Sequence, residues 1–291
     1  MKNKNIKLVY WNEPNFGDLL SPYIIKKLTG NSIIHKKGFI SRKRIITDFF
    51  RNLLRLNFSK ISSILFPWER NILAIGSILN LSNSNSLIWG SGFMYENQKF
   101  HGGKIYALRG PYSNNIIKKM GYKGCNIFGD PALLLPLVAP INQDKTHEIG
   151  IIPHWSETEF FKKEYGNKYH IIDFRTNKIE ETIENITSCK YILSTSLHGI
   201  IVSQAYGIPA LWIKKGKINT DGIKFKDYFA SVNIIPYNGF ENINEILSDE
   251  KNIKDLFIEN TDKSCIKCDL KHIQKQLLEA APFKINQEFQ I

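Results

Sequence analysis

The chain has 291 residues, of which 43% are hydrophobic and 23% charged, and its formal net charge at pH 7 is +12. This length allows one large or two ordinary domains with a sizeable hydrophobic core. No run of about 18 apolar residues is present, so we expect no membrane-spanning helix. Neither a zinc-finger pattern nor a basic run interleaved with aromatic residues occurs, which argues against nucleic acid as the partner. The positive charge instead favours phosphate or carboxylate substrates, or anionic lipid.

The amino terminus and the cysteines favour a cytoplasmic protein. Residues 1–5 lead into the first strand without the apolar region of a signal peptide. The four cysteines are therefore expected to be reduced thiols. Cys265 and Cys268 form a lone CxxC pair, whereas a structural zinc site normally has a second pair of ligands. Two ordinary thiols are our expectation, and zinc is the alternative.

The first segment reads as strand, loop and helix. Residues 6–11 are apolar and rich in strand-forming types, and a helix pattern follows that closes near Gly30. Between them, Gly17 allows a tight turn or a close approach to a ligand. Asp18 can cap the helix or act as a base. The loop lacks the GxGxxG pattern, so a dinucleotide is not indicated.

Residues 35–70 are strongly basic. They hold nine Lys or Arg against two Asp or Glu, so that 9 − 2 gives a net charge of +7. Apolar pairs recur every four residues at 45–46, 49–50 and 53–54, which predicts a helix with an apolar stripe. Such a helix can lie in a membrane interface. The alternative is a core helix with a solvated basic back.

Three further strands are predicted at 72–75, 86–89 and 105–108, followed by a helix over 113–120. Each strand ends in small residues next to a polar group. Ser91 and Arg109 stand at such positions, and Asp130 stands at a similar one after the run 126–128. A parallel sheet brings the carboxyl ends of its strands to one edge, where ligands bind. We therefore expect a ligand site at this edge.

After a linker at 136–146 the pattern restarts. Strands are predicted at 148–152, 169–172 and 191–193, with helices near 156–164 and over 178–188. The fold class is therefore α/β, with two Rossmann-like domains, 1–140 and 145–291, facing across a cleft. The tail over 242–281 has helical spacing, and we expect residues 282–291 to be poorly packed.

The stretch 193–209 joins a buried strand to a short helix through two serines and a histidine. Ser194 and Ser196 can cap the helix, whose amino terminus would offer N–H groups to an anion. His198 either meets that anion or is a core histidine. A serine hydrolase is not expected, because the G-x-S-x-G elbow is absent. A catalytic metal is not expected.

Six short motifs resemble, in order and approximate spacing, those of the polysaccharide pyruvyl transferases. They are Asn15-Phe-Gly-Asp18, Trp89-Gly-Ser-Gly-Phe93, Ala107-Leu-Arg-Gly-Pro111, Gly129-Asp-Pro-Ala132, Ile152-Pro-His-Trp155 and Ser194-Thr-Ser-Leu-His-Gly199 with Ala205-Tyr-Gly-Ile-Pro209. The resemblance implies a fold like the GT-B glycosyltransferases. It also implies transfer of pyruvate from phosphoenolpyruvate to a sugar, forming a cyclic ketal across two hydroxyls, without a metal or another cofactor.

The resemblance also assigns residues. Arg109 and His198 match the arginine and histidine that hold the donor, and Lys224 best matches a donor-site lysine, with Lys226 as its competitor. We expect His198 to transfer a proton or only to grip phosphate, and Asp18 to act as base on the sugar hydroxyl. The remaining expected substrate-binding residues are Ser91, His154, Ser194, Ser196 and Gly199.

The implied setting is the biosynthesis of bacterial surface polysaccharide, such as capsule. The expected acceptor is a galactose- or mannose-type sugar linked to undecaprenyl diphosphate at the inner face of the cytoplasmic membrane. The alternative activity is that of a GT-B glycosyltransferase that uses a nucleotide sugar. A further alternative is a non-enzymatic membrane-surface or polyanion-binding module built on residues 35–70.

Overall fold

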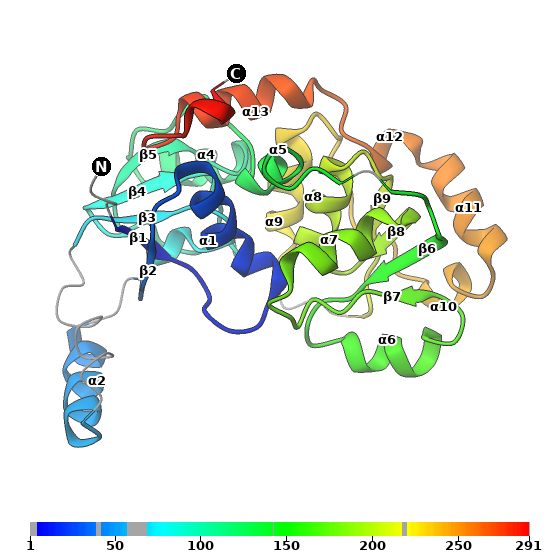
Figure 1. Cartoon of the computed structure of the whole chain (residues 1–291), viewed down its shortest axis with the longest axis horizontal. Coiled ribbons are helices and arrows are strands. Elements are labelled where there is room, and N and C mark those ends of the chain that lie inside the picture. The colour runs from blue at the N-terminus through cyan, green and yellow to red at the C-terminus, as the bar shows by residue number, and fades with distance from the viewer. Residues whose placement is uncertain (1–4, 39–41, 57–68, 142, 217–219, 291) are drawn as a thin grey trace.

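The computed structural model of the chain describes residues 5–38, 42–56, 69–141, 143–216 and 220–290. It contains two parallel sheets (Figure 1), with strand orders β2-β1-β3-β4-β5 and β7-β6-β8-β9. All pairings within the two sheets are parallel. The α/β class with Rossmann-like halves is therefore confirmed, whereas the GT-B arrangement and the two domain boundaries stay predictions.

The first sheet is built as the sequence predicts, with one addition. Its strands are β1 (Ile6–Val9), β2 (Ile33–Lys36), β3 (Asn71–Leu73), β4 (Ser86–Trp89) and β5 (Lys104–Ala107). The short edge strand β2 was not expected. Helix α1 (Phe16–Thr29) begins at Asn15, whose side chain accepts a hydrogen bond from Gly17 N at 3.1 Å, and ends at Gly30 with a φ of +66°. Helix α4 (Pro111–Lys119) covers most of the predicted 113–120.

The second sheet carries the helices that matter for the site. Its strands are β6 (His147–Ile152), β7 (His170–Ile171), β8 (Cys189–Ser194) and β9 (Ala210–Trp212). The helices between and after them are α6 (Thr158–Tyr165), α7 (Ile179–Thr187), α8 (Leu197–Ala205) and α9 (Ile223–Ser231). Strand β8 is buried at Ile192 and Leu193 and feeds directly into α8, as the sequence predicts.

One hydrophobic cluster joins the two halves. It runs from Leu20 of α1 through Leu133 to Ile200 of α8. Leu133 belongs to η2 (Pro131–Leu134), which continues into α5 (Leu135–Val138) at the start of the predicted linker. The halves are therefore packed against each other through apolar side chains, and this packing fixes the helices whose amino termini meet at the junction.

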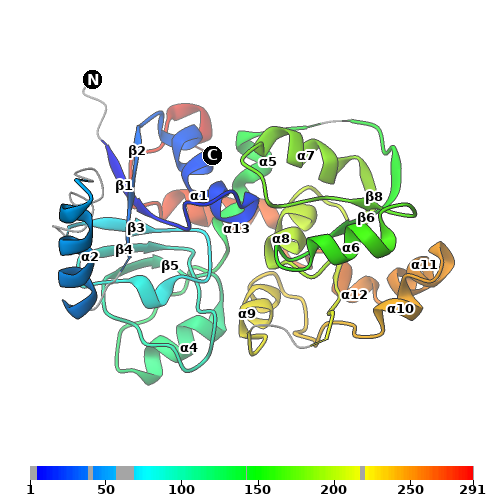
Figure 2. The same cartoon turned by 90° about the horizontal axis from the view of Figure 1, so that it is seen from below.

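The carboxyl-terminal tail returns to the first sheet. It comprises α10 (Ile243–Ile246), α11 (Glu250–Glu259), α12 (Thr261–Ser264), α13 (Leu270–Glu279) and η3 (Gln287–Phe289). Figure 2 shows α13 crossing toward α1. Trp89 Nε1 donates to Leu277 O at 2.8 Å, and the Trp89 and Phe283 rings lie 5.1 Å apart. Ile285 is 7% exposed. The expectation that residues 282–291 pack poorly is therefore wrong for the described part of this segment.

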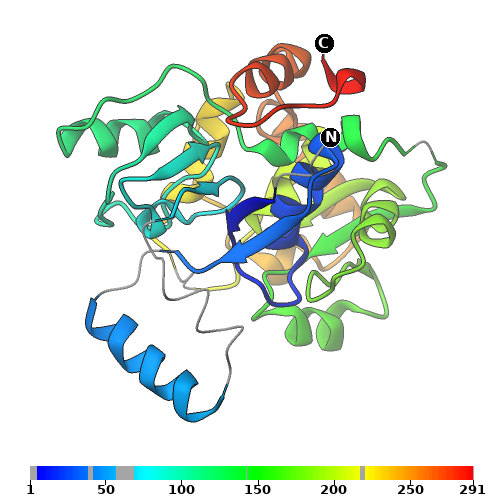
Figure 3. The ribbon, with the colours of Figure 1, turned by 60° about the vertical axis from the view of Figure 1, so that its left-hand side comes forward.

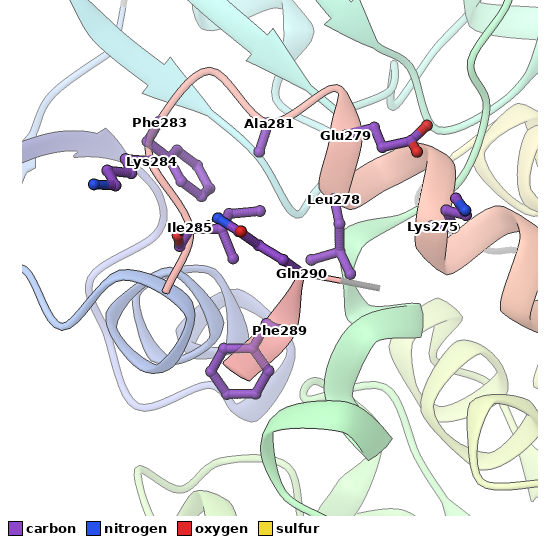
Figure 4. A pocket seen from close by; sticks show the side chains of 9 residues that line it. All are labelled: Lys275, Leu278, Glu279, Ala281, Phe283, Lys284, Ile285, Phe289 and Gln290. Atoms are coloured by element: carbon purple, nitrogen blue, oxygen red, sulfur yellow. Dashed lines mark hydrogen bonds between the residues drawn. The ribbon is translucent and has the colours of Figure 1, made fainter. Parts of the chain in front are cut away.

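A pocket of about 320 Å³ lies in this tail, lined by Lys275, Leu278, Glu279, Ala281, Phe283, Lys284, Ile285, Phe289 and Gln290 (Figure 4). None of the residues predicted to bind substrate lines it.

Helix α2 (Arg42–Leu54) confirms the helix predicted within residues 35–70. It stands apart from the two sheets (Figures 1 and 3). Residues 57–68 of the basic segment, and the side chains of 42–46 and 48, lie outside the described residues. No helix in the described part of the chain is both long and apolar enough to cross a membrane.

Candidate active site at the junction of the two sheets

His198 lies in the first turn of α8 and packs against the other half of the molecule. A Cβ atom placed on Gly17 of α1 would lie 2.2 Å from His198 Nδ1, so a side chain at that position would displace the imidazole. The Nε2 atom is buried and has no hydrogen-bond partner among the described residues. The glycine predicted to allow close approach therefore admits the His198 ring of the opposite half.

The surroundings of His198 disfavour its protonated form. Burial, followed by the charges of Lys224 and Arg109, lowers the pKa of His198 to about 3. The imidazole is therefore neutral at pH 7 in this structure, which argues against proton exchange near neutral pH without a ligand. A bound anion would counter both causes and raise this pKa.

Lys224 lies in the first turn of α9 and is 9% exposed. Burial and Arg109 lower its pKa to about 8, while Asp18 and Glu157 act in the opposite direction. Lys224 forms no salt bridge with any described residue and remains charged at pH 7. Lys226 is only half-buried. Lys224 is thus the lysine that meets the predicted site, where the Asp18 and Glu157 carboxyls act on it without forming a salt bridge among the described residues.

Asp18 lies in the first turn of α1. Burial raises the pKa of its carboxyl to about 6, and Lys224 opposes this shift. The capping role belongs instead to Asn15. No hydrogen bond to the Asp18 carboxylate is formed within the described residues. Asp18 is therefore available as an acid or a base close to neutral pH.

Arg109 is fully buried and already has three partners. Its Nε donates to Asp227 Oδ2 at 3.1 Å, Nη1 to Ser77 Oγ at 2.6 Å and Nη2 to Phe93 O at 2.7 Å. A Cβ atom on Gly92 would lie 2.3 Å from its Cζ atom. Arg109 thus joins the first half to α9, and its charge acts on both Lys224 and His198. Its contact with a donor stays a prediction.

Three of the expected substrate-binding residues, Ser91, Ser194 and Gly199, take part in the packing around the site. Ser91 donates to Gly76 O at 2.8 Å, and Ser194 donates to Ile152 O at 2.8 Å. Both side chains are fully buried. A Cβ atom on Gly199 would lie 2.3 Å from Ser194 Oγ, so this glycine permits α8 to sit close to β8. The hydroxyl groups of Ser91 and Ser194 therefore donate to the protein's own backbone, and Gly199 allows close packing of α8 on β8.

His154 and Ser196 lie nearer the surface. Burial and Lys224 lower the pKa of His154 to about 4, and its Nδ1 lies 2.8 Å from Ser156 Oγ. Ser196 is the residue before α8, and its side chain makes no capping hydrogen bond. Both residues are half-exposed, so each can still meet a ligand.

Glu157 was missed by the sequence analysis, because no motif includes it. Thr195 Oγ1 donates to Glu157 Oε2 at 2.5 Å and accepts a hydrogen bond from His154 N at 2.6 Å. Burial raises the pKa of Glu157, while Lys215 and Lys224 oppose the shift. A carboxylate three residues after His154, in the loop that follows β6, is the only signal that the sequence offered.

The junction thus collects groups suited to anion binding and proton transfer. Lys224 and Arg109 supply positive charge, His198 supplies an unpartnered nitrogen, and Asp18 and Glu157 supply carboxyls from opposite halves. The amino terminus of α8 adds N–H groups without intrahelical partners. No group of three or more His, Cys, Asp or Glu side chains that could hold a metal ion occurs within the described residues.

Comparisons with known proteins agree with the motifs. Residues 15–214 match the family described as polysaccharide pyruvyl transferase. A protein of Acanthamoeba polyphaga mimivirus, described as uncharacterized protein L143, is 32% identical over 166 residues, which cover 54% of this chain and 58% of the viral protein. The chain therefore spans less than two thirds of the length of this relative. No solved structure matches the chain significantly.

Proposed function

Since this chain belongs to the polysaccharide pyruvyl transferase family, we propose that it transfers pyruvate from phosphoenolpyruvate onto two hydroxyls of a sugar. The observation that carries the donor assignment is the buried Lys224 ammonium, which forms no salt bridge among the described residues and lies close enough to His198 to lower its pKa. Burying an unpaired charge is costly, so such a site is stabilised when an anion binds.

Phosphoenolpyruvate matches this charge pattern. It carries a phosphate and a carboxylate on the same carbon atom, C2, and two cations with a helix amino terminus can bind both groups. We assign the phosphate to Lys224, His198 and the first turn of α8. Arg109 adds positive charge to the site, and its hydrogen bond to Asp227 holds α9, which carries Lys224, in place.

The reaction balances with two sugar hydroxyls. A proton is added to C3 of the enol ether, and C2 then resembles an oxocarbenium ion that the first hydroxyl attacks. The C2–O bond to phosphate breaks, and the second hydroxyl closes the ketal at C2. Of the two hydroxyl protons, one replaces the proton given to C3 and the other leaves on inorganic phosphate.

Two carboxyl groups of raised pKa are available for these transfers. We assign Asp18, whose pKa is about 6, as base for a sugar hydroxyl. Glu157, held by Thr195, is assigned as the acid that protonates C3. Positioned acids and bases of this kind contribute about 10²–10⁴-fold to a rate. Once phosphate is bound, His198 regains basicity and can protonate the departing phosphate.

The acceptor belongs to the proposal as well. We propose a galactose- or mannose-type sugar linked to undecaprenyl diphosphate, modified at the cytoplasmic side of a membrane for surface polysaccharide such as capsule. The family supports a polysaccharide-related acceptor, and the lipid linkage is our extension of it.

Glycosyl transfer from a nucleotide sugar is not favoured. Its donor would need a carboxylate free to bind ribose in the second half, after α8. Asp221 instead accepts hydrogen bonds from Glu96 N and Ile223 N, and Asp227 accepts from Arg109 and Ser113. Both acidic residues between α8 and the end of α9 are therefore engaged.

The test is to incubate the purified chain with phosphoenolpyruvate and candidate lipid-linked sugars. We expect phosphate release and, by mass spectrometry, a product heavier by pyruvate minus water. Calorimetry provides a second test, in which phosphoenolpyruvate binds to the wild type and nucleoside diphosphates do not. Binding of a nucleoside diphosphate alone would contradict the proposal.

A further inference from the structure

Helix α2 and the turn that follows it, which holds Leu56, present large apolar side chains to solvent. Leu54 is 86% exposed, Leu56 is 73% exposed and Phe50 is 57% exposed. Phe50 and Leu54 are four residues apart and so lie on one side of the helix, with Leu53 (41% exposed) beside them. Scattered exposed leucines are ordinary in soluble proteins, but a stripe of them on one helix marks an interaction surface. We call Phe50, Leu53, Leu54 and Leu56 the α2 stripe.

Nothing in the described part of the chain covers the α2 stripe. No described helix or strand makes an extensive contact with α2. The helix stands off the body in two views related by rotation (Figures 1 and 3). The core-helix alternative from the sequence analysis therefore does not hold within the described residues, where the stripe stays exposed.

The charge of the same segment selects the partner. Residues 35–70 carry a net charge of +7, and Arg55 is exposed next to the stripe. A second copy of the chain would bring two such segments together and would be repelled. An anionic bilayer offers an apolar layer for the stripe and negative headgroups for the lysines and arginines, each of which contributes about 1 kcal/mol near such a surface.

The topology places this helix at the edge that carries the active-site loops. Strand β2 runs parallel to β1, with Lys36 in register with Val9. Residue 36 is therefore at the same edge as residue 9, from which the chain proceeds to Gly17 and Asp18. Lys36 also pairs with Glu69 at 2.6 Å, so the chain that leaves this strand is held to the chain that returns to β3.

We propose that α2 is a docking element for an anionic membrane surface, with the α2 stripe inserted at the boundary between headgroups and acyl chains. Docking in this way turns the site edge of the first sheet toward the bilayer. The proposal rests on exposure, charge and topology, and it does not require the proposed reaction. If a lipid-linked acceptor is used, α2 brings the site to it.

The experiment is vesicle co-flotation of the full chain, with vesicles of phosphatidylcholine alone and of phosphatidylcholine with phosphatidylglycerol. The variant is Phe50→Glu/Leu54→Glu. Its matched control is Ile235→Glu/Ile258→Glu, which alters two exposed apolar side chains outside α2, 77% and 70% exposed. We expect wild type and control to float with anionic vesicles, and flotation of the α2 variant to fall at least tenfold. Flotation with uncharged vesicles should be weak for all three proteins.

Several results would overturn the proposal. If the α2 variant floats as well as wild type, the stripe does not contribute to membrane binding. If wild type does not float, the protein does not bind this membrane surface. Light scattering without vesicles addresses self-association, since a wild-type dimer that the variant makes monomeric would identify the stripe as an interface between copies. Circular dichroism and binding of phosphoenolpyruvate should match wild type in both variants, so a failure of the docking proposal is separable from a failure of the proposed reaction.

Discussion

The junction and helix α2 are opposite departures from ordinary packing. At the junction, Lys224 is buried without a salt bridge and His198 Nε2 is buried without a hydrogen-bond partner among the described residues. On α2, the apolar side chains of Phe50 and Leu54 are exposed to solvent. Each arrangement is unfavourable in the isolated chain, because charge prefers water and apolar surface avoids it. A partner of matching chemistry removes the free-energy penalty in each case. For the junction this partner is an anion, and for α2 it is a bilayer.

The comparison also separates two kinds of residue within the junction. Arg109 is as buried as Lys224, but all three of its nitrogens have partners. Lys224 has none of this kind. We therefore expect substitution of Arg109 to affect folding and substitution of Lys224 to affect function, and the predictions below test this difference.

The largest effect is expected for Arg109→Met. This change leaves Asp227 buried without its cation, and breaking such a pair costs about 3–5 kcal/mol of unfolding free energy. Chemical denaturation of wild type and variant measures the loss. Asp227→Asn in the Arg109→Met background should recover part of it, because the remaining charge is removed. An Arg109→Met protein as stable as wild type would show that Arg109 does not hold the two halves together.

The next effect is on turnover. Lys224→Met should lower kcat/KM for phosphoenolpyruvate about 10²–10³-fold, the usual result of removing one electrostatic contact to the reacting group. Its melting temperature should rise, since burial lowers the pKa of Lys224 and so disfavours the charge that the apolar side chain replaces. Loss of activity together with a gain in stability is the outcome that a purely structural lysine cannot give. If Lys226→Met loses donor binding instead, the assignment passes to Lys226.

Most strands could be predicted from the sequence because buried parallel strands form continuous apolar runs. Residues 86–89 were predicted and found as β4, and the helix after Ser196 was predicted from its capping residues. The edge strand β2 was missed, because residues 33–36 are only partly buried and lack a clear pattern. The return of α13 to Trp89 also escaped prediction, since it depends on contacts between residues almost 190 positions apart.

The sequence motifs located residues of the candidate site but could not assign a role to each of them. Sequence motifs located Asp18, Arg109 and His198, and all three act electrostatically on Lys224 or are acted on by it. What the motifs could not give is which polar atoms are already engaged. Ser91 and Ser194 donate to backbone carbonyls, and Glu157 becomes visible only through its contact with Thr195. Burial and hydrogen bonding decide these roles, and both depend on the tertiary fold.

A smaller effect is expected where the two halves touch. Gly17→Ala should destabilise the protein by about 1–3 kcal/mol, because the new methyl group overlaps the His198 ring. The double variant Gly17→Ala/His198→Ala removes the overlap and should show little of this loss beyond that of His198→Ala alone. Thermal denaturation of the four proteins gives the coupling between the two positions. An additive result would mean that the two side chains do not meet in solution.

The smallest expected effect is a change of kcat/KM with pH. The pKa of Asp18 is raised to about 6, so its carboxylate form, required of a base, increases as the pH rises through 6. The pKa of Lys224 is lowered to about 8, so its cationic form is lost as the pH rises through 8. We therefore expect a bell-shaped profile of kcat/KM with limbs near these two values.

The substrate's own phosphate also titrates near pH 6, so the acidic limb needs an internal control. Asp18→Asn should abolish that limb and leave the basic one if the carboxylate is the base. The same limb in the variant would assign it to the donor. Linkage gives a second check of the sign. A carboxyl whose pKa is higher in the folded than in the unfolded state destabilises the folded protein once it ionises. Stability relative to Asp18→Asn should therefore decline as the pH rises from about 4 to 6 in the absence of ligand.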